Sequence, residues 1–156
     1  MIEWQWKRFD EITAAQMHEM LKLRQDVFIL EQQCLYPDID SLDPLAHHLF
    51  GYASDGDNQD ALAAYLRVFT AGIKFPEVSI GRVLIDNRFR GKGSGKQLIS
   101  KALQKLDQDY PKDAIKISAQ VYLEAFYVGF GFTSISDAYD EDGIMHIDML
   151  RTKSHS

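Results

Sequence analysis

The stretch Arg88-Phe-Arg-Gly-Lys-Gly-Ser-Gly95 places three glycines between a strand pattern and a helix pattern. The apolar run 78–85 precedes it and predicts a strand, while the amphipathic run 94–109 predicts a helix that begins at its end. Glycines leave backbone N–H groups uncovered, and the helix dipole adds partial positive charge where those groups lie. The stretch therefore predicts a binding site for a phosphate-bearing ligand.

Positive charge is concentrated around this stretch. The chain holds 17 basic and 23 acidic residues, which gives a net charge of −6. Residues 82–105 contain seven basic residues and one acidic residue, so this segment carries +6 and the rest of the chain carries −12. The rest of the surface would repel a long polyanion, which argues against nucleic acid and favours a small anionic ligand.

Two well-known phosphate-binding motifs do not fit the spacing. A P-loop needs a glycine five residues before its Gly-Lys-Ser/Thr, but Arg90 stands five residues before Gly95, and Gln97 follows Lys96. A dinucleotide-binding Gly-x-Gly-x-x-Gly motif needs a third glycine at the position of Lys96. The pattern that remains is Arg90-x-x-Gly93-x-Gly95 at a strand-to-helix junction.

This remaining pattern resembles the pyrophosphate-binding loop of the GNAT superfamily of N-acyltransferases. The segment Ala125-Phe-Tyr-Val-Gly-Phe-Gly-Phe132 resembles a helix end of the same superfamily. Within that superfamily the chain is similar to ElaA proteins over nearly its whole length. The similarity rests on Ile2-Glu-Trp4, the segment from Leu23 to Gln32, Asp38-Ile-Asp40, Ile80-Gly-Arg-Val83, and the segment from Tyr139 to His146.

The resemblance implies an acyl-CoA-dependent N-acyltransferase that uses acetyl-CoA and an unidentified primary amine, which attacks the thioester directly. It implies that Tyr127 protonates the leaving thiolate, and that backbone N–H groups near residues 83–85 stabilise the oxyanion. The residues expected to bind the acyl-CoA are Val83, Leu84, Ile85, Arg90, Gly91, Lys92, Gly93, Ser94, Gly95 and Lys96. Two alternatives are an acyl-CoA sensor without turnover and another phosphate-ligand enzyme, such as a nucleotide-dependent one.

Direct attack by an amine also calls for a general base. An acceptor amine with a pKa of about 10.4 is protonated at neutral pH and must lose a proton before it attacks. Glu31, His48 and His146 are candidates, and we take Glu31 and His146 as predicted catalytic residues beside Tyr127. A solvated carboxylate at a helix end and hydrogen-bonded strand histidines are the simpler interpretations of the same residues.

Two acidic stretches are candidates for recruiting a cationic amine. Loop carboxylates attract a cation, although solvated loops have the same composition. The carboxylates are Asp38, Asp40 and Asp43 in the irregular stretch 32–45, and Asp137, Asp140, Glu141 and Asp142 in a later one.

The order of elements predicts an α+β fold with a mixed, mostly antiparallel sheet of six to seven strands and helices on both faces. In the run 78–85 the apolar residues Val78 and Ile80 have even numbers, whereas Val83 and Ile85 have odd numbers. Since side chains along a strand alternate between the faces of the sheet, this change of parity predicts a β-bulge at Gly81-Arg82. The predicted strands are 2–6, 48–53, 61–69, 78–85, 115–121, 132–135 and 144–150, the predicted helices are 13–28, 94–109 and 123–131, and a turn is predicted at 54–58.

Length and composition predict a single GNAT-like domain over residues 1–156. The sequence contains no run of ~18 apolar residues, so we expect neither a membrane helix nor a membrane partner, and no signal-peptide pattern is visible. The lone Cys34 excludes an intrachain disulfide and a cysteine-based zinc cluster, and the adjacent His47 and His48 would point to opposite faces of a strand, so we expect no metal. We expect a cytoplasmic location, and a homodimer is one of the oligomeric states left open.

Overall fold

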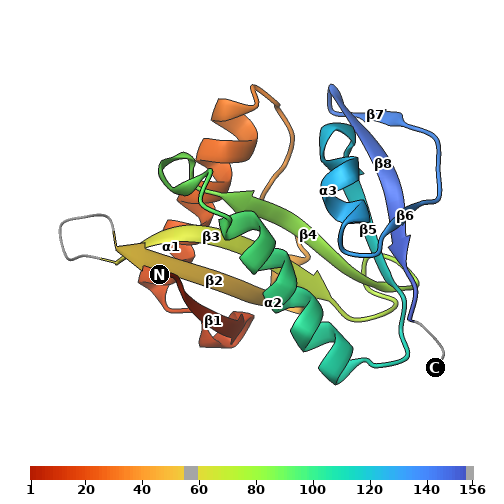
Figure 1. Ribbon diagram of the computed structural model, residues 1–156. Helices are drawn as coiled ribbons and strands as arrows, with labels where there is room; N and C mark the ends of the chain where they lie inside the picture. The colour runs from red at the N-terminus through yellow and green to blue at the C-terminus, as the bar shows by residue number, and fades with distance from the viewer. Residues whose placement is uncertain (55–59, 154–156) are drawn as a thin grey trace.

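One mixed sheet runs through the residues described by the computed structural model, 1–54 and 60–153. Its strand order is β1-β2-β3-β4-β5-β8-β6, with β7 paired to β8 (Figure 1). The pair β4–β5 is parallel and the other described pairs are antiparallel. The strands are β1 (Glu3–Arg8), β2 (His47–Ser54), β3 (Asp60–Phe69), β4 (Val78–Ile85), β5 (Ile115–Gln120), β6 (Thr133–Ser134), β7 (Tyr139–Glu141) and β8 (Ile144–Arg151).

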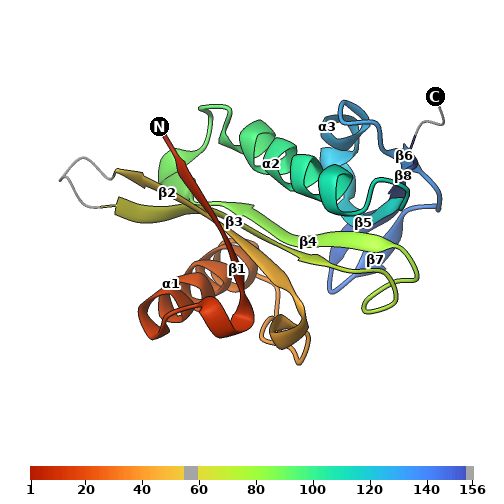
Figure 2. The same cartoon turned by 90° about the horizontal axis from the view of Figure 1, so that it is seen from below.

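Helices cover both faces of this sheet, as the sequence predicts. Helix α1 (Ala14–Arg24) lies on one face, and α2 (Ser94–Asp109) and α3 (Glu124–Val128) lie on the other (Figure 2). A capping box begins α1, because Thr13 Oγ1 accepts from Gln16 N at 3.1 Å and Gln16 Oε1 accepts from Thr13 N at 3.1 Å. Short 3-10 turns are η1 (Phe9–Glu11), η3 (Asp43–Leu45), η4 (Asn87–Phe89) and η5 (Val121–Leu123), and α1 continues as the π-helical η2 (Gln25–Glu31).

Each face of the sheet packs a separate apolar core, because side chains along a strand alternate between the faces. In β3, Leu66 belongs to the core beneath α2 and α3, and Tyr65 belongs to the core beneath α1. Leu98 and Leu106 bring α2 onto the first core, and Met20 brings α1 onto the second. No helix in the described part of the chain has both the length and the apolar character needed to cross a membrane.

The bulge predicted in β4 is confirmed by the register of the sheet. Tyr65 pairs with Leu84, but Arg67 pairs with Gly81, so β4 has one residue more than β3 over this interval. Arg82 takes up the extra residue with a left-handed backbone conformation, φ +52°. Because of the bulge, residues 78, 80, 83 and 85 all contact the core beneath α2 and α3, although their numbers change parity, and Leu84 faces the core beneath α1.

Within the described residues the sheet has eight strands rather than the predicted six to seven, because the short strand β7 pairs with β8. The two residues between these strands, Asp142 and Gly143, have φ +54° and +85°. Positive φ at both positions is the requirement of a type I′ turn, for which Asp-Gly is a strong sequence signal. Helix α3 ends at Val128, three residues before the predicted end, because residues 129–131 form a turn that ends in the left-handed Gly131, φ +94°. The predicted turn at 54–58 falls outside the described residues except for Ser54.

Candidate functional site

The central feature of the site is the separation of β4 and β5. These parallel strands pair only at Val78 with Ile115 and at Ser79 with Lys116. Beyond those positions, residues 80–85 of β4 have no described partner in β5. One edge of β4 therefore offers backbone N–H and C=O groups that the sheet does not use.

The hydrogen bonds of β4 show which groups point to this open edge. Asp86 N donates to Ala63 O at 2.7 Å and so points toward β3. Because successive N–H groups of an extended strand alternate between its edges, the N–H groups of Val83 and Ile85 point away from β3. Arg90 Nε donates to Ile85 O at 2.9 Å, which is consistent with an open edge on that side.

The glycine loop, residues 90–95, lies directly beyond this edge and leads into α2. Gly91 and Gly93 have φ +80° and +78°, and Gly93 is the N-cap of α2. A Cβ atom at either position would meet nothing within 4 Å, so the glycines are required by their backbone conformation and not by crowding. The first N–H groups of α2 have no partner within the helix. They converge on the loop together with the positive end of the helix dipole.

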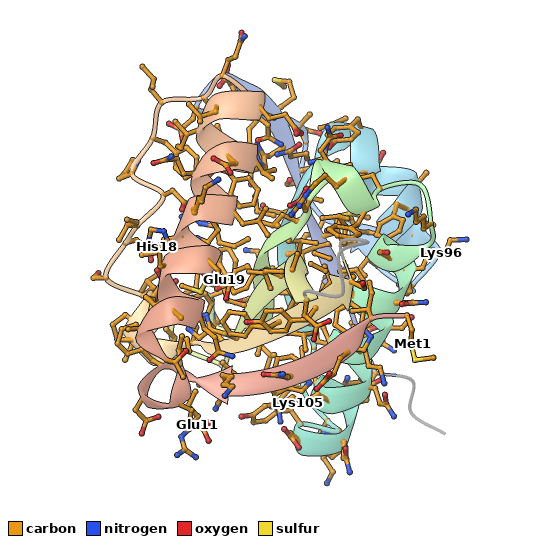
Figure 3. The ribbon with its side chains drawn as sticks, turned by 90° about the vertical axis from the view of Figure 1, so that its left-hand side faces the viewer. Met1, Glu11, His18, Glu19, Lys96 and Lys105 are labelled. Carbon is orange, nitrogen blue, oxygen red and sulfur yellow. The ribbon has the colours of Figure 1, made fainter. Side chains whose placement is uncertain are left out.

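The seven basic residues of the segment 82–105 are not gathered at one place. Arg90, Lys92 and Lys96 lie at the glycine loop, and Lys96 extends outward from the first turn of α2 (Figure 3). Lys105 lies further along α2, stacks on the Trp6 ring at 5.3 Å and pairs with Asp109 at 3.0 Å. The positive charge at the loop is therefore smaller than the sequence segment indicates.

Glu31 lies at the glycine loop, where its side chain contacts Arg90. Its Oε2 atom lies 2.8 Å from Arg90 Nη1, and both side chains are about two-fifths exposed, at 41% and 38%. The contact joins the end of η2 to the loop. Glu31 therefore has a cationic partner in this conformation, which a free general base would lack.

Tyr127 lies on α3 with its ring in the core beneath α2 and α3. The residue is 5% exposed, and its ring packs edge-on against Phe126 and Phe132, with centroids 5.2 and 5.9 Å away. Phe126 reaches the glycine loop, because a Cβ atom on Gly95 would lie 3.8 Å from its Cζ atom. Burial raises the pKa of the Tyr127 phenol, with a smaller contribution from Tyr122, so the hydroxyl stays protonated at neutral pH.

His146 lies on β8 beside the end of β5, where Gln120 is its register partner. Its Nδ1 atom lies 2.8 Å from the carbonyl oxygen of Ile144, and a carbonyl only accepts, so Nδ1 carries the proton in the neutral ring. The Nε2 atom keeps its lone pair and lies 3.5 Å from Glu141 Oε2. This arrangement leaves a nitrogen lone pair beside a carboxylate.

A chain of hydrogen bonds that the sequence did not reveal lies next to His146. Tyr139 stacks on the His146 ring with centroids 6.2 Å apart, and its hydroxyl donates to Asp148 Oδ1 at 2.6 Å. Ser118 Oγ lies 2.5 Å from the same hydroxyl and acts as the donor, since the phenol has only one proton. Burial and the bond to Asp148 raise the pKa of Tyr139 to about 12. The alternating polar positions of β5 and β8 were the only available signal for this group.

The segment after η2 contacts the sheet near this group. Gln120 Nε2 donates to Gln32 Oε1 at 3.3 Å. Cys34 Sγ donates to the carbonyl oxygen of Asp142 at 3.0 Å. Residues 32–34 therefore contact both the end of β5 and the β7–β8 turn, on the side where β4 and β5 separate.

The first acidic stretch, by contrast, is occupied by arginines. Arg24 lies 3.0 Å from Asp38 and 2.9 Å from Asp43, and Arg67 lies 2.7 Å from both Asp40 and Asp43. Arg82 Nε lies 2.9 Å from Asp38 Oδ1, and its Nη2 lies 3.4 Å from Asp40 Oδ2. We call this group of three arginines and three aspartates the ion cluster. The proposal that these aspartates recruit a cationic amine is wrong, because their charges are already matched.

His48 is also unsuited to the role of general base. It is fully buried, and both ring nitrogens are occupied, with Nδ1 2.6 Å from the Tyr65 hydroxyl and Nε2 2.9 Å from Asp43 O. Since the carbonyl only accepts, Nε2 donates to it and Nδ1 accepts from the phenol. Burial lowers the pKa of His48, so the ring is a neutral structural link. Across residues 1–54 and 60–153, no group of three or more His, Cys, Asp or Glu side chains is placed to hold a metal ion.

Comparisons with known proteins agree with this geometry. The family model described as an acetyltransferase (GNAT) domain matches residues 43–153. Protein ElaA of Escherichia coli is 38% identical over 153 residues, which cover 97% of both chains. A UPF0039 protein of Synechocystis sp. is 46% identical over 149 residues, which cover 96% of this chain and 94% of the relative.

Two crystal structures with full coverage are similar as well. Escherichia coli ElaA has a TM-score of 0.88 at 37% identity, covering 97% of this chain and 99% of the other. A protein from Pseudomonas aeruginosa described as an acyl-CoA N-acyltransferase has a TM-score of 0.87 at 35% identity, covering 97% and 100%. This chain therefore shares its overall fold with these proteins.

Proposed function

Because this chain belongs to the GNAT family of acetyltransferases and is a homologue of ElaA, we propose that it transfers an acetyl group from acetyl-CoA to a primary amine. The observation that carries the proposal is the junction of an open strand edge with a left-handed glycine loop at a helix N-terminus. The two parts match the amide-rich arm and the diphosphate of coenzyme A. The description of the Pseudomonas aeruginosa relative as an acyl-CoA N-acyltransferase supports the same donor class.

The donor would bind mainly through the backbone. N–H groups of residues 91–96 would bind the diphosphate, with Arg90, Lys92 and Lys96 adding side-chain charge. The pantetheine arm would lie along residues 83–85, where the N–H groups of Val83 and Ile85 face the open edge. The thioester would then lie where β4 and β5 separate, between α3 and the end of β5.

We propose His146 as the general base, in preference to Glu31. His146 Nε2 has a free lone pair beside Glu141, whereas the Glu31 carboxylate is paired with Arg90. The base takes a proton from the ammonium form of the acceptor, directly or through one water, and the neutral amine then attacks the thioester carbonyl carbon. The C–N bond forms, and the carbonyl electrons move to the oxygen, where the N–H group of Val83 would stabilise the negative charge.

Tyr127 would assist the departure of the thiolate. When the tetrahedral intermediate collapses, the C–S bond breaks and the electron pair leaves with sulfur, while the attacking nitrogen, which is positively charged after attack, releases its second proton to solvent. Burial raises the pKa of Tyr127 above that of a free phenol, and a thiol has a pKa of about 8.5, so complete proton transfer to the thiolate is uphill. Tyr127 therefore acts chiefly as a hydrogen-bond donor to the sulfur, and solvent supplies the proton. This revises the simple general-acid role that the sequence motif implies.

The acceptor would be a cationic amine attracted by the β7–β8 hairpin. Asp137, Asp140, Glu141 and Asp142 lie there without an ion pair to any described lysine or arginine. Opposite charge in the approach path raises the local concentration of the amine. We also propose a cytoplasmic location, which fits the single cysteine, and the possibility of a homodimer stays a prediction.

The test is a panel of primary amines with acetyl-CoA, in which release of free CoA thiol is measured. We expect saturable CoA binding without Mg²⁺ and thiol release with at least one cationic amine. Tyr127→Phe should lower kcat about tenfold or more while the Kd for CoA stays within about threefold, since the hydroxyl acts on the leaving group only. Saturable CoA binding without thiol release from any amine would indicate a sensor, and tighter binding of ATP with Mg²⁺ would indicate a nucleotide-dependent enzyme.

A further inference from the structure

Arg82 occupies a backbone conformation that a glycine would adopt more easily. Its φ is +52° within β4, while the neighbouring Gly81 has no positive φ. A side chain larger than hydrogen disfavours this left-handed region, and a non-glycine residue found there is held by its surroundings. The protein therefore places an arginine, and not its adjacent glycine, at the strained position of the bulge.

The side chain of Arg82 is held at several points by the ion cluster. Its Nε lies 2.9 Å from Asp38 Oδ1, and its Nη2 donates to Asp38 O at 3.2 Å and to Asp40 Oδ2 at 3.4 Å. The guanidinium also lies over the Tyr36 ring, 5.3 Å from its centroid. Arg24 also pairs with Asp38, and Arg67 also pairs with Asp40. The residues that hold Arg82 thus belong to a largely buried group of ion pairs.

The conformation of residue 82 decides which amides β4 presents to the open edge. With the bulge, Leu84 pairs with Tyr65 in β3. Without the extra residue, Val83 would take that place in the ladder, and its N–H group would point toward β3. The left-handed conformation thus moves the Val83 N–H group to the edge where β4 and β5 separate.

We propose that Arg82 is a positioning residue, whose ion pairs with Asp38 and Asp40 hold the bulge and so point the Val83 N–H group at the acyl carbonyl. The inference rests on the proposed acyl transfer. Arg82 itself touches neither substrate, and it acts through the backbone of the residue that follows it. Residues far from the glycine loop would thereby control the rate of transfer and not the affinity for the donor.

A matched pair of substitutions tests this. Arg82→Ala removes the ion pairs and disfavours the left-handed conformation, so kcat should fall about tenfold or more, while the Kd for CoA stays within about threefold. Arg82→Gly removes the same ion pairs but permits the conformation, so kcat should stay within about threefold of the parent value. Arg82→Asn, which tolerates the left-handed region better than alanine, should fall between the two. Lys7→Ala and Lys7→Gly in β1 serve as controls, and neither should change kcat.

Hydrogen exchange of single amides supplies a readout that needs no turnover. In the parent protein the Val83 amide should exchange fast and the Leu84 amide slowly, because only Leu84 lies in the β3 ladder. In Arg82→Ala the order should reverse as the bulge relaxes, and in Arg82→Gly it should be kept. If the parent protein acetylates no amine, the proposed function fails, but the exchange experiment still tests the role of Arg82.

The proposal is overturned by any of three results. Equal losses of kcat in Arg82→Ala and Arg82→Gly would mean that the side chain acts directly. A lower Tm with unchanged kcat in Arg82→Ala would mean that it only stabilises the fold. Unchanged exchange at Val83 and Leu84 in a folded Arg82→Ala protein would mean that the bulge does not depend on it.

Discussion

Two acidic regions that look alike in the sequence have opposite surroundings in the folded protein. The aspartates of residues 38–43 are matched by Arg24, Arg67 and Arg82, and Asp38 and Asp43 are almost fully buried, at 7% and 4% exposure. Asp140, Glu141 and Asp142, at the β7–β8 turn, have no ion pair with a described lysine or arginine, and the Glu141 side chain is 53% exposed. The negative charges of the first region are neutralised by ion pairs within the protein, while those of the second region are available to a ligand.

The difference shows that the role of a loop carboxylate depends on whether it forms an ion pair within the protein, and not on its position in a loop. A buried aspartate between two arginines is important for stability, because removal of the aspartate or of its arginines would leave an uncompensated buried charge. An exposed carboxylate adds little to stability but contributes to the field that a charged ligand meets. Substitutions in the two regions should therefore affect different measurements.

The largest effect should come from Asp43→Asn in the ion cluster. Asp43 Oδ1 accepts from Arg24 Nη1 at 2.9 Å and from Arg67 Nη1 at 2.7 Å. Removal of its charge leaves two buried guanidinium groups with less compensation, so the free energy of unfolding should fall by about 3 kcal/mol or more. Urea denaturation measures this. Glu141→Gln is the matched control and should change the free energy of unfolding by no more than about 0.5 kcal/mol. A loss below about 1 kcal/mol for Asp43→Asn would contradict the role assigned to the cluster.

The next largest effect concerns the hairpin side of the comparison. His146→Gln removes the proposed base, so kcat should fall about 100-fold. The Kd for CoA should not change, because His146 lies on β8, away from the glycine loop. Steady-state kinetics with the best amine of the panel and calorimetric CoA titration measure the two quantities. Glu31→Gln should lower kcat less than His146→Gln does, and the reverse order would assign the base to Glu31.

A smaller effect should appear in the pH dependence of stability. Burial acts to raise the pKa of Asp40, but hydrogen bonds from Arg67 and the nearby arginine charges outweigh it and hold the pKa well below its usual value. Folding therefore favours the ionised form of Asp40. Its contribution to the free energy of unfolding is complete above about pH 5 and is lost as the pH falls below about 3.9, the pKa of an aspartate in the unfolded chain. Asp40→Asn should destabilise the protein by about 1–2 kcal/mol at pH 7. Urea titrations at several pH values should show this difference shrinking below about pH 5, and a difference that grows toward acid would contradict the ion pairing.

The smallest effect should come from Glu141→Gln in kinetics. Loss of one carboxylate on the approach path should raise KM for a cationic amine about threefold at low salt, with little change in KM for acetyl-CoA. High salt should reduce the difference between parent and variant, because exposed charges are screened. An unchanged KM at every salt concentration would remove the hairpin from the proposed acceptor site.

Local patterns predicted most of the fold. The parity switch around Gly81-Arg82 depends on a few adjacent residues, and the structure contains the bulge that it predicts. The β7 strand was missed because two of its three residues are acidic and therefore poor strand formers, although the Asp142-Gly143 turn signal was present. The sequence pattern also could not show how far α3 extends, since its end depends on packing in the turn that follows.

The site was harder to predict, because it is built from contacts distant in the sequence. Arg82 and Asp40 are 42 residues apart in the chain, and Tyr139 and Ser118 are 21 apart, so no local pattern links them. The glycine loop could be found because its residues are contiguous. The sequence alone could not distinguish Glu31 from His146 as the proposed base. The distinction depends on the salt bridge of Glu31 to Arg90 and on the hydrogen bond of His146 to the carbonyl oxygen of Ile144.

The most direct test of the account is a crystal structure of the protein with acetyl-CoA. We expect diphosphate oxygens within about 3 Å of backbone N–H groups of the glycine loop and the first turn of α2, with the pantetheine arm along residues 83–85 and the acetyl carbonyl facing Val83 N. The account would be contradicted by acetyl-CoA bound elsewhere on the protein, or by side chains that fill the space between β4 and β5 and keep the thioester out.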